Sequence, residues 1–326
     1  MSHICVVEHG SVLGIDSGKL KVTKSNGEIC CFPLETVEGI SIFSAASVTS
    51  QCMNFCLKND VPISYFSQNG VYLGSFVSAF PDNATRLKKQ VLLSENIDFS
   101  LAFGRKIIEA KINNQVVVLR RLRNLNSSDS IEQLSSYRKK ALKAKDIAVL
   151  RGYEGMASKC YFGALSEIIP KELCFVGRSG RHAKDPVNAL LNLGYSMLTK
   201  EIFGEIENRG LSSYIGFIHK DRINHPSLAS DLIEEWRPVI VDSVVMNFIK
   251  YNNVDYQMIN GNCSLSNSCI KKFMKEYERK LNSTNRYLDY FNEEVTFREA
   301  LWHQAYRMVK VIDTSDVNQY KPVRIR

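Results

Sequence analysis

The sequence GFIHKDRINHPSLASDLIEEWRPVIVD, residues 216–242, places one histidine before a polar loop and then gathers acids on one side of an expected helix that begins near Ser227. Asp231 and Glu234 stand three residues apart, so they project from the same helix face one turn from each other. Apolar side chains cover the other side of this helix. Because a hard divalent cation prefers carboxylate oxygens and accepts an imidazole, this pattern together with His219 predicts a divalent metal site.

Asp242 lies eight residues beyond Glu234. A straight helix would carry it on roughly the same face, but Pro238 lacks a backbone N–H and predicts a bend between them. We therefore expect Asp242 to be a hydrogen-bonding residue beyond the bend.

Length and composition are those of a soluble globular protein. The chain has 326 residues, 44% hydrophobic and 23% charged, which is enough for two domains and a substantial core. The net charge of +8 fits either solubility or a nucleic-acid partner. No apolar run approaches the ~18 residues of a membrane span, and no signal-peptide pattern opens the sequence. A cytoplasmic protein without a membrane partner is expected.

The nine cysteines have the distribution of reduced thiols. Their number is odd, which favours reduced thiols over a disulfide framework, and none forms a CxxC pair or has the spacing of a zinc ribbon. Cys52 and Cys56 stand four apart on an apolar helical stripe, where small buried side chains are expected.

Residues 1–80 have the pattern of a β-rich domain. Asn26-Gly27 predicts a hairpin, and Ser47 is a fair N-cap for one helix. No acids and histidines cluster here, so this domain is expected to serve folding or dimerisation through strand edges. Short β-branched or aromatic runs predict strands at residues 4–7, 12–15, 19–22, 28–32, 39–42, 62–66 and 71–78.

The periodicity changes from two-residue to helical at the turn formers of residues 81–83. We expect a linker at residues 81–95 and a helical catalytic domain at residues 96–326. An apolar stripe predicts a helix over Ser100–Arg123, and the Asn- and Ser-rich residues 124–130 predict a loop. The expected fold class is α+β, with a β-sandwich-like domain before an all-α domain.

Two dense basic runs bracket that loop. The second contains Arg138, Lys139 and Lys140 within a helical segment. Such a run is usually a solvated helix face, but its place before an acidic site favours contact with a phosphate backbone.

Glu154 stands between Gly152 and Gly155 on an otherwise half-apolar helix. An acid there is costly unless it is paired or coordinated, and glycines weaken a helix by ~1 kcal/mol each. Two interpretations stay open for the glycines, close approach of another helix or of a ligand. For Glu154 itself, the alternative to a ligand role is a pair with a buried arginine.

Residues 175–184 form a basic, glycine-containing loop. Arg178, Arg181 and Lys184 are expected to bind nucleic acid, because the flanking glycines give the side chains reach. Asp185 then predicts an N-cap, with Pro186 at the first helical position. Asn188 stands where its side chain can reach back to the loop.

Four motifs in a fixed order resemble the CRISPR-associated spacer integrases, the Cas-one family. They are Glu154-Gly155 followed by an aromatic-bearing helix, DPVNALLNLGY from Asp185, GFIH from Gly216, and PSLASDLIEEWRP from Pro226. The resemblance covers nearly the whole chain. It implies an N-terminal β-sandwich, a C-terminal helical catalytic domain and a homodimer.

The resemblance implies that Glu154, His219 and Glu234 are the catalytic metal ligands. Some family members have aspartate where this chain has Glu234, which is the same ligand type on a shorter arm. Asp231 matches a supporting acid, and its closer spacing to His219 leaves open which acid ligates directly. His225 is the competing histidine, expected to face DNA or to cap.

The implied activity is integration of foreign DNA with Mg²⁺ or Mn²⁺. The 3′-hydroxyl of a DNA fragment attacks the CRISPR repeat by direct transesterification, and water in its place gives endonuclease activity. The resemblance also implies that two dimers flank a dimer of a small partner, Cas-two, in a heterohexamer. The segment from Tyr320 to Arg326 is a candidate partner contact by position only. Two alternatives are a stand-alone metal-dependent nuclease and a non-catalytic basic DNA-binding scaffold.

Overall fold

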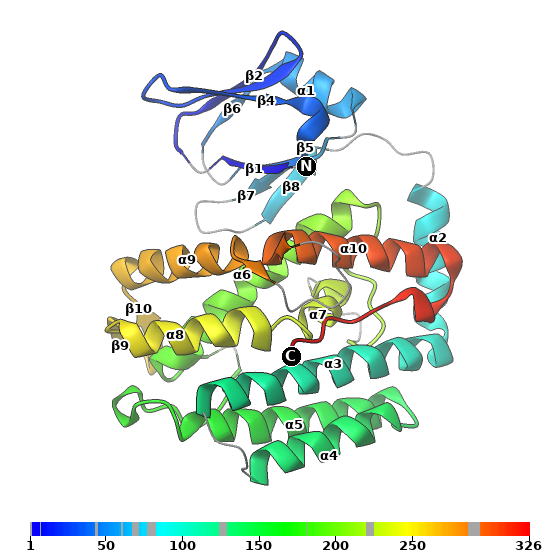
Figure 1. The fold of residues 1–326 in the computed structure, drawn as a ribbon, viewed down its shortest axis with the longest axis vertical. Helices are drawn as coiled ribbons and strands as arrows, with labels where there is room; N and C mark the ends of the chain where they lie inside the picture. Colours follow the sequence, from blue (N-terminus) through cyan, green and yellow to red (C-terminus); the bar gives the residue numbers. More distant parts are fainter. Residues whose placement is uncertain are drawn as a thin grey trace. The chain divides into compact units, whose positions relative to one another are not determined.

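The computed structural model describes residues 2–6, 8–42, 45–59, 61–66, 72–76, 83–123, 129–180, 182–219, 225–285 and 294–326. The chain divides into two compact units. One comprises Met1–Thr85 with Phe203–Leu211, and the other Arg86–Ile202 with Ser212–Arg326. Strands dominate the first unit and helices the second (Figure 1), so the expected fold class is confirmed. Within the described ranges, no helix has both the length and the apolar composition of a transmembrane span.

The first unit is built from two four-stranded sheets. One has the order β1-β5-β7-β8, with bounds Ser2–Val6, Val37–Ile42, Ile63–Phe66 and Tyr72–Phe76. The other has the order β4-β3-β2-β6, with bounds Ile29–Pro33, Lys19–Thr23, Val12–Asp16 and Ser47–Val48. Ile40 and Ile63 of the first sheet and Leu13 and Leu20 of the second belong to one buried cluster. The unit therefore has the shared core of a sandwich.

Helix α1 (Ser50–Lys58) adds Cys52 and Cys56 to this core as buried thiols. The expectation that Ser47 caps the helix is wrong. Ser47 is committed to strand β6, where its N–H donates to Ser11 O at 2.9 Å. Thr49 is the cap instead, because its Oγ1 accepts from Cys52 N at 3.2 Å.

The expected hairpin at Asn26-Gly27 pairs β3 with β4 in antiparallel register. Its connection is longer than the two-residue turn that the sequence predicts, because residues 24–28 all lie outside the strands. Asn26 Oδ1 accepts from Glu28 N at 2.9 Å, and Gly27 has a φ of +84°. Gly27 thus supplies the left-handed residue that the turn requires.

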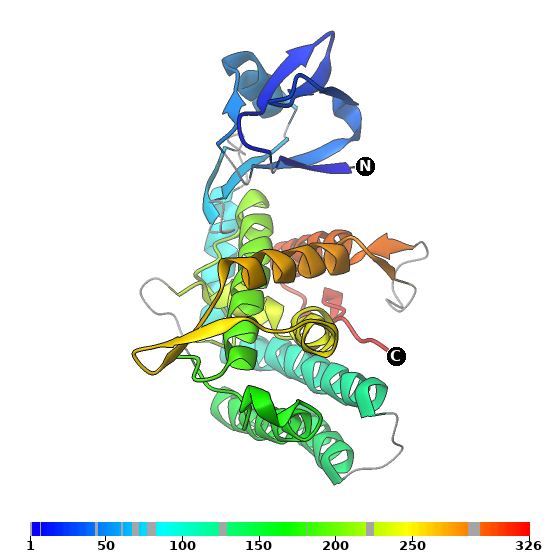
Figure 2. The same ribbon diagram turned by 90° about the vertical axis from the view of Figure 1, so that its left-hand side faces the viewer.

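The second unit contains three helices that pack against one another, α3 (Ile97–Arg123), α4 (Asp129–Leu142) and α5 (Ile147–Ser166). Figures 1 and 2 show them side by side. The predicted apolar stripe of α3 is buried, with Ile107 and Ile112 fully covered. Of the expected loop 124–130, residues 124–128 lie outside the described residues.

The elements after α5 follow in chain order. They are η2 (Lys171–Leu173), α6 (Pro186–Asn208), α7 (Ser227–Ile233), η3 (Pro238–Asp242), α8 (Ser243–Tyr251), β9 (Tyr256–Ile259), β10 (Asn262–Leu265), α9 (Asn267–Leu281), β11 (Thr284–Asn285), β12 (Val295–Thr296), α10 (Phe297–Thr314) and η4 (Val317–Gln319). A further short helix, η1 (Leu34–Thr36), belongs to the first unit. The β9-β10 hairpin projects from the helices of the second unit (Figure 2).

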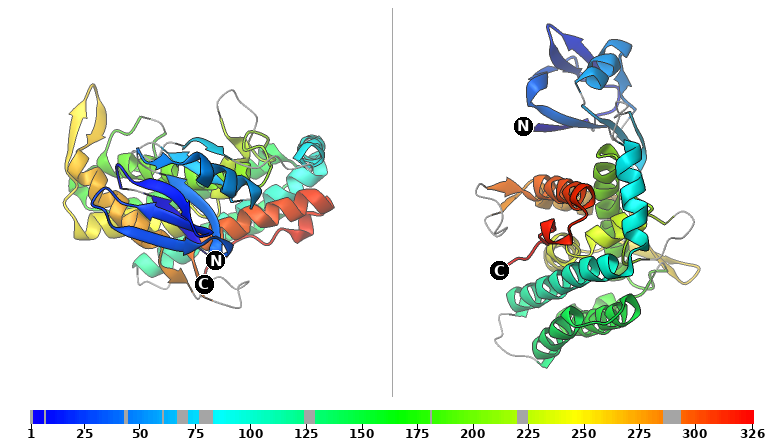
Figure 3. Two further views of the ribbon diagram at one scale, coloured as in Figure 1. Left: turned by 90° about the horizontal axis from the view of Figure 1, so that it is seen from above. Right: turned by 90° about the vertical axis from the view of Figure 1, so that its right-hand side faces the viewer.

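The predicted linker 81–95 is largely helical. Residues 83–95 form α2 (Asn83–Glu95), which runs in a different direction from α3 (Figure 3), while residues 81 and 82 lie outside the described residues. Gln90 is fully buried. Its amide donates to Ser212 O and Ile215 O, each at 2.8 Å, and accepts from Ser212 N at 2.9 Å. These contacts tie α2 to the segment just before Gly216.

The segment from Tyr320 to Arg326 packs within the helical unit. Tyr320, Val323 and Ile325 are at most 3% exposed. Asn114 of α3 donates to Val323 O at 3.0 Å and accepts from Ile325 N at 3.0 Å. The buried half of this segment is therefore committed to intramolecular contacts, while Lys321, Arg324 and Arg326 are exposed.

Candidate metal centre

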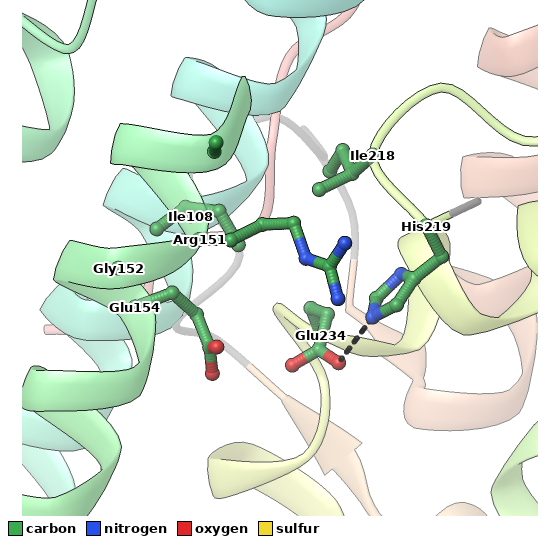
Figure 4. Close-up of a pocket in the computed structure, with 8 residues that line it drawn as sticks. Ile108, Arg151, Gly152, Glu154, Ile218, His219 and Glu234 are labelled. Atoms are coloured by element: carbon green, nitrogen blue, oxygen red, sulfur yellow. Dashed lines mark ion pairs between the residues drawn. The ribbon is translucent and has the colours of Figure 1, made fainter. Parts of the chain in front are cut away.

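Three of the sequence-predicted residues line one cavity of about 410 Å³. Glu154 projects from α5, His219 follows the segment that Gln90 anchors, and Glu234 directly follows α7. Figure 4 shows the three side chains turned toward a common space, with Arg151 reaching into it. The structure thus brings together residues that are 65 and 15 positions apart in the sequence.

Asp231 fixes the orientation of His219. Its Oδ1 lies 2.6 Å from His219 Nδ1 and also accepts from His219 N at 3.0 Å. Its Oδ2 accepts from Phe217 N at 2.6 Å and from Ile218 N at 3.0 Å. With Nδ1 engaged, Nε2 is the ring nitrogen on the Glu234 side, 4.0 Å from Glu234 Oε1.

Asp231 is fully buried and both of its oxygens are engaged. The geometry is therefore that of a supporting acid behind the histidine, which is the arrangement that orients imidazole ligands in metal sites. Burial disfavours the imidazolium of His219, but the hydrogen bond and charge of Asp231 and the charge of Glu234 outweigh it. The pKa of His219 is consequently raised above its ordinary value.

Glu234 is 3% exposed. Its carboxylate lies beside Lys111, Arg237 and His219. Its Oε2 forms an ion pair with Lys111 Nζ at 2.6 Å, and its Oε1 forms one with Arg237 Nη1 at 3.0 Å. Burial by itself would raise the pKa of Glu234, yet the charges of Arg237, Lys111 and His219 lower it to about 2. Glu234 is therefore ionised and available as an anionic ligand at neutral pH.

Lys111 of α3 also contacts Glu154, so its ammonium bridges the two carboxylates. Burial disfavours the charged lysine, but the charges of Glu154 and Glu234 raise its pKa. The partner of Glu154 is thus a buried lysine, where the sequence suggested a buried arginine. Ser158 Oγ adds a hydrogen bond to Glu154 Oε1 at 2.9 Å.

The two glycines beside Glu154 do not support a helix contact. Among the described residues, no heavy atom outside their own helix lies within 4 Å of the position that a Cβ would take at Gly152 or Gly155. The interpretation of close helix approach is wrong. Open space beside the cavity remains consistent with the other interpretation, approach of a ligand.

The donor set fits Mg²⁺ or Mn²⁺, since one imidazole nitrogen and two carboxylates face the same cavity. The two carboxylates already bind one cation, the ammonium of Lys111. In the described part of the chain, however, no three His, Cys, Asp or Glu side chains stand close enough together to hold an ion without adjustment.

A second cavity, about 190 Å³, shares Glu154 with the first and is lined by Lys111 as well. Tyr195 is one of its lining residues, with the guanidinium of Arg237 4.8 Å and that of Arg178 5.3 Å from the ring centroid. Tyr195 Oη donates to Asp242 Oδ1 at 2.5 Å. Burial raises the pKa of Asp242 to about 6 despite this bond. Asp242 is a hydrogen-bonding residue, as expected, and the five residues from Pro238 to Asp242 form a π-helix.

The basic loop before α6 is held by hydrogen bonds to residues at the start of that helix. Asp185 Oδ1 accepts from Asn188 N at 2.8 Å in the geometry of an N-cap, and Pro186 opens α6. Asn188 reaches back to the loop, donating to Gly177 O at 2.9 Å. Arg178 does not extend outward as expected, because its guanidinium donates to Asn188 Oδ1 at 2.9 Å and Asn192 Oδ1 at 2.6 Å.

The other predicted DNA-binding residues differ in exposure. Lys139, Lys140 and Lys184 are exposed, whereas Arg138 is half-buried and donates to Asn113 Oδ1 at 2.6 Å. Arg181 lies outside the described residues. His225 lies beside His219, with 6.2 Å between ring centroids.

Sequence reasoning missed Lys111, Arg151 and Arg237 as parts of this centre. Arg151 precedes Glu154 by three positions and Arg237 follows Glu234 by three. Helical spacing therefore places each beside a predicted ligand and would have found them. Lys111 had no such signal, because it lies on α3, 43 positions before Glu154.

Comparison with known proteins identifies the family. Residues 4–279 match the model of the family described as CRISPR associated protein Cas1, so the chain belongs to the Cas1 family. It is 33% identical over 328 aligned positions to "CRISPR-associated endonuclease Cas1 3" of Thermus thermophilus, covering 99% of this chain and 97% of that protein.

Solved structures share the fold. One, "Partial Cas6-RT-Cas1--Cas2 complex", superimposes with a TM-score of 0.81 at 21% identity, covering 99% of this chain and 98% of that one. Another, "Casposase bound to integration product", gives a TM-score of 0.72 at 23% identity, covering 97% and 96%. The fold is thus shared from end to end with these proteins.

Proposed function

We propose that this chain is a metal-dependent DNA integrase of CRISPR adaptation, with endonuclease activity at the same centre. One observation carries the proposal: in a chain of the Cas1 family, Glu154, His219 and Glu234 face one cavity from three separate segments. Two names support this reaction class. The Thermus thermophilus relative is named an endonuclease, and one structural neighbour is a casposase bound to integration product.

Glu154, His219 and Glu234 would hold Mg²⁺ or Mn²⁺, which supplies Lewis-acid stabilisation of charge on a phosphodiester when bound. Asp231 keeps His219 Nε2 directed toward Glu234, and the charges of Lys111 and Arg237 keep Glu234 ionised. Arg151 reaches into the same cavity, where its guanidinium is suited to a phosphate oxygen (Figure 4).

The proposed reaction needs no nucleophile from the protein. The 3′-hydroxyl of a foreign DNA fragment forms a new P–O bond with a phosphate of the CRISPR repeat. The repeat's own P–O bond breaks and its strand leaves with a hydroxyl end. Attack by water on the same phosphate gives hydrolysis. The role of the chain is to position and to stabilise charge, which is the general strategy for phosphoryl transfer.

Exposed basic side chains, Lys139 and Lys140 on α4 and Lys184 before α6, are proposed to hold the DNA backbone. We further propose a homodimer that assembles with a small Cas2-type partner, two dimers to one partner dimer. The name of the structural neighbour that contains Cas1 and Cas2 supports such a partner.

A strand-transfer assay tests the function. Labelled DNA fragments, a Cas2-type partner and a supercoiled plasmid with a CRISPR repeat are incubated with Mn²⁺ and the wild type, Glu154→Ala, His219→Ala or Glu234→Ala. Glu172→Ala, at an exposed acid, is the matched control. We expect the wild type and the control to join fragments, and each site variant to lose at least about a hundredfold in rate.

The same assay separates the alternatives. Cleavage without joining would indicate a stand-alone nuclease. DNA binding that is unchanged in EDTA, with neither cleavage nor joining, would indicate a scaffold. Full joining by His219→Ala would refute the assigned metal centre.

A further inference from the structure

Lys111 stands between two carboxylates of the candidate metal centre. Its side chain is 6% exposed and its ammonium pairs with both carboxylates that we propose as ligands, Glu154 and Glu234. The remaining oxygen of Glu234 pairs with Arg237. The carboxylates thus already hold a cation that belongs to the chain itself.

A divalent cation on these carboxylates would compete with the lysine in this arrangement. Carboxylate oxygens bind Mg²⁺ at about 2.0–2.1 Å, so an ammonium on the same carboxylates would stand next to a double positive charge. The repulsion between the lysine ammonium and a divalent cation on the same carboxylates is strong even with the screening typical of proteins. Either Lys111 moves or the cation binds weakly.

The structure offers Lys111 a place to move. Lys111 also lines the adjoining cavity of about 190 Å³, together with polar groups of Gln115, Tyr195 and Asp242. Asp242 is a fully buried acid that the proposed reaction does not use. Because a lysine has a flexible four-carbon stem and three donors that rotate freely, its ammonium can exchange partners within this space.

We propose that Lys111 is an exchangeable counter-cation, which holds Glu154 and Glu234 together until a divalent metal ion binds and then moves toward Asp242 in the adjoining cavity. This inference rests on the proposed metal-dependent function. It assigns Lys111 a positioning role. The lysine stabilises Glu154 and Glu234 while no metal ion is bound, and its competition for these carboxylates lowers their affinity for the ion.

Isothermal titration of the chelator-treated full chain with Mn²⁺ tests the inference without any activity measurement. Lys111→Met and Lys111→Gln remove the competing charge, and we expect each to bind Mn²⁺ about tenfold or more tightly than the wild type. The matched control is Lys275→Met on the exposed face of α9, which removes one positive charge far from the ligands in sequence and should leave the affinity unchanged. Circular dichroism establishes that each variant is folded.

A measurement on the wild type covers the case in which both variants fail to fold. Lysine side-chain ¹⁵N NMR follows the ammonium of Lys111 during titration with diamagnetic Mg²⁺, and we expect its resonance to shift as the ion binds. Equal or weaker Mn²⁺ binding by the folded variants, or an unmoved Lys111 resonance in Mg²⁺-saturated protein, would overturn the exchange. A wild type that binds neither ion would overturn the proposed metal centre itself, so the two failures are distinguishable.

Discussion

Asp231 holds His219 at two points, accepting from its backbone N–H at 3.0 Å and lying 2.6 Å from its ring Nδ1. The same carboxylate accepts two further backbone N–H groups, those of Phe217 and Ile218. One buried acid therefore sets both the path of the chain before His219 and the direction of its imidazole. The stability of the helical unit and the geometry of the candidate centre are coupled through this residue.

Replacement of Asp231 by asparagine should damage stability and activity together. The amide NH₂ would face N–H donors in place of one carboxylate oxygen, so we expect a loss of about 2–4 kcal/mol in the free energy of unfolding. Metal-dependent cleavage should fall by about 10- to 100-fold, as is typical for partners of ligating histidines. Urea denaturation and a DNA cleavage assay measure the two effects. Asp255→Asn, at an exposed acid, is the control and should change neither.

Gly216 should not tolerate a methyl group. A Cβ at this position would lie 2.8 Å from Ser227 C and Cβ and 2.9 Å from Asp231 Oδ2. Gly216→Ala is therefore expected to lower the free energy of unfolding by about 1–3 kcal/mol. Gly163→Ala in α5 is the matched control, since a Cβ there meets nothing within 4 Å; it should be neutral or stabilising by up to about 1 kcal/mol. Equal stability of the two variants in urea would contradict the close approach at Gly216.

Glu235 should make stability depend on pH. Burial raises its pKa from 4.5 to about 8, although Tyr320 Oη and Val323 N each donate to it at 2.8 Å. Between these pH values the folded state holds one more proton on this group than the unfolded state. The free energy of unfolding therefore falls as pH rises through this window and levels off above about pH 8.

Glu235→Gln cannot titrate, so it isolates this contribution from those of other groups. We expect its slope of unfolding free energy against pH to be shallower than that of the wild type by up to about 1.4 kcal/mol per pH unit. Urea denaturation of both proteins at several pH values between 5 and 8 measures the slopes. Parallel slopes would show that Glu235 is ionised in the folded protein.

The exposed lysines of α4 should contribute to DNA affinity through charge alone. For the double variant Lys139→Ala/Lys140→Ala, we expect weaker binding and a slope of log affinity against log salt that is shallower by about 1–2. Lys271→Ala/Lys272→Ala, at exposed positions of α9, is the control with the same change in net charge. Fluorescence anisotropy at several salt concentrations measures both. An identical slope for the two double variants would exclude α4 as a specific contact surface.

Local chemistry explains what could be predicted from the sequence. Alternating β-branched residues gave the strands of the first unit, and the apolar stripe over 100–123 gave most of α3. Asp185-Pro186 marked the start of α6 because capping depends on adjacent residues. Where tertiary contacts compete with local preference, the prediction failed. Ser47 is a strand residue because its N–H donates to Ser11 O, so the helix is capped by Thr49 in its place.

By itself the sequence determined the order of the four motifs, and with it the three residues proposed as ligands. Those motifs are read along the chain, so no three-dimensional information is needed to find them. Only the tertiary structure decided that the Asp231 carboxylate binds the His219 ring and three backbone N–H groups, and that a lysine from α3 bridges Glu154 and Glu234. Such pairings depend on which side chains packing brings within a few ångströms, and a separation of 43 positions between Lys111 and Glu154 leaves no trace of that contact in the sequence.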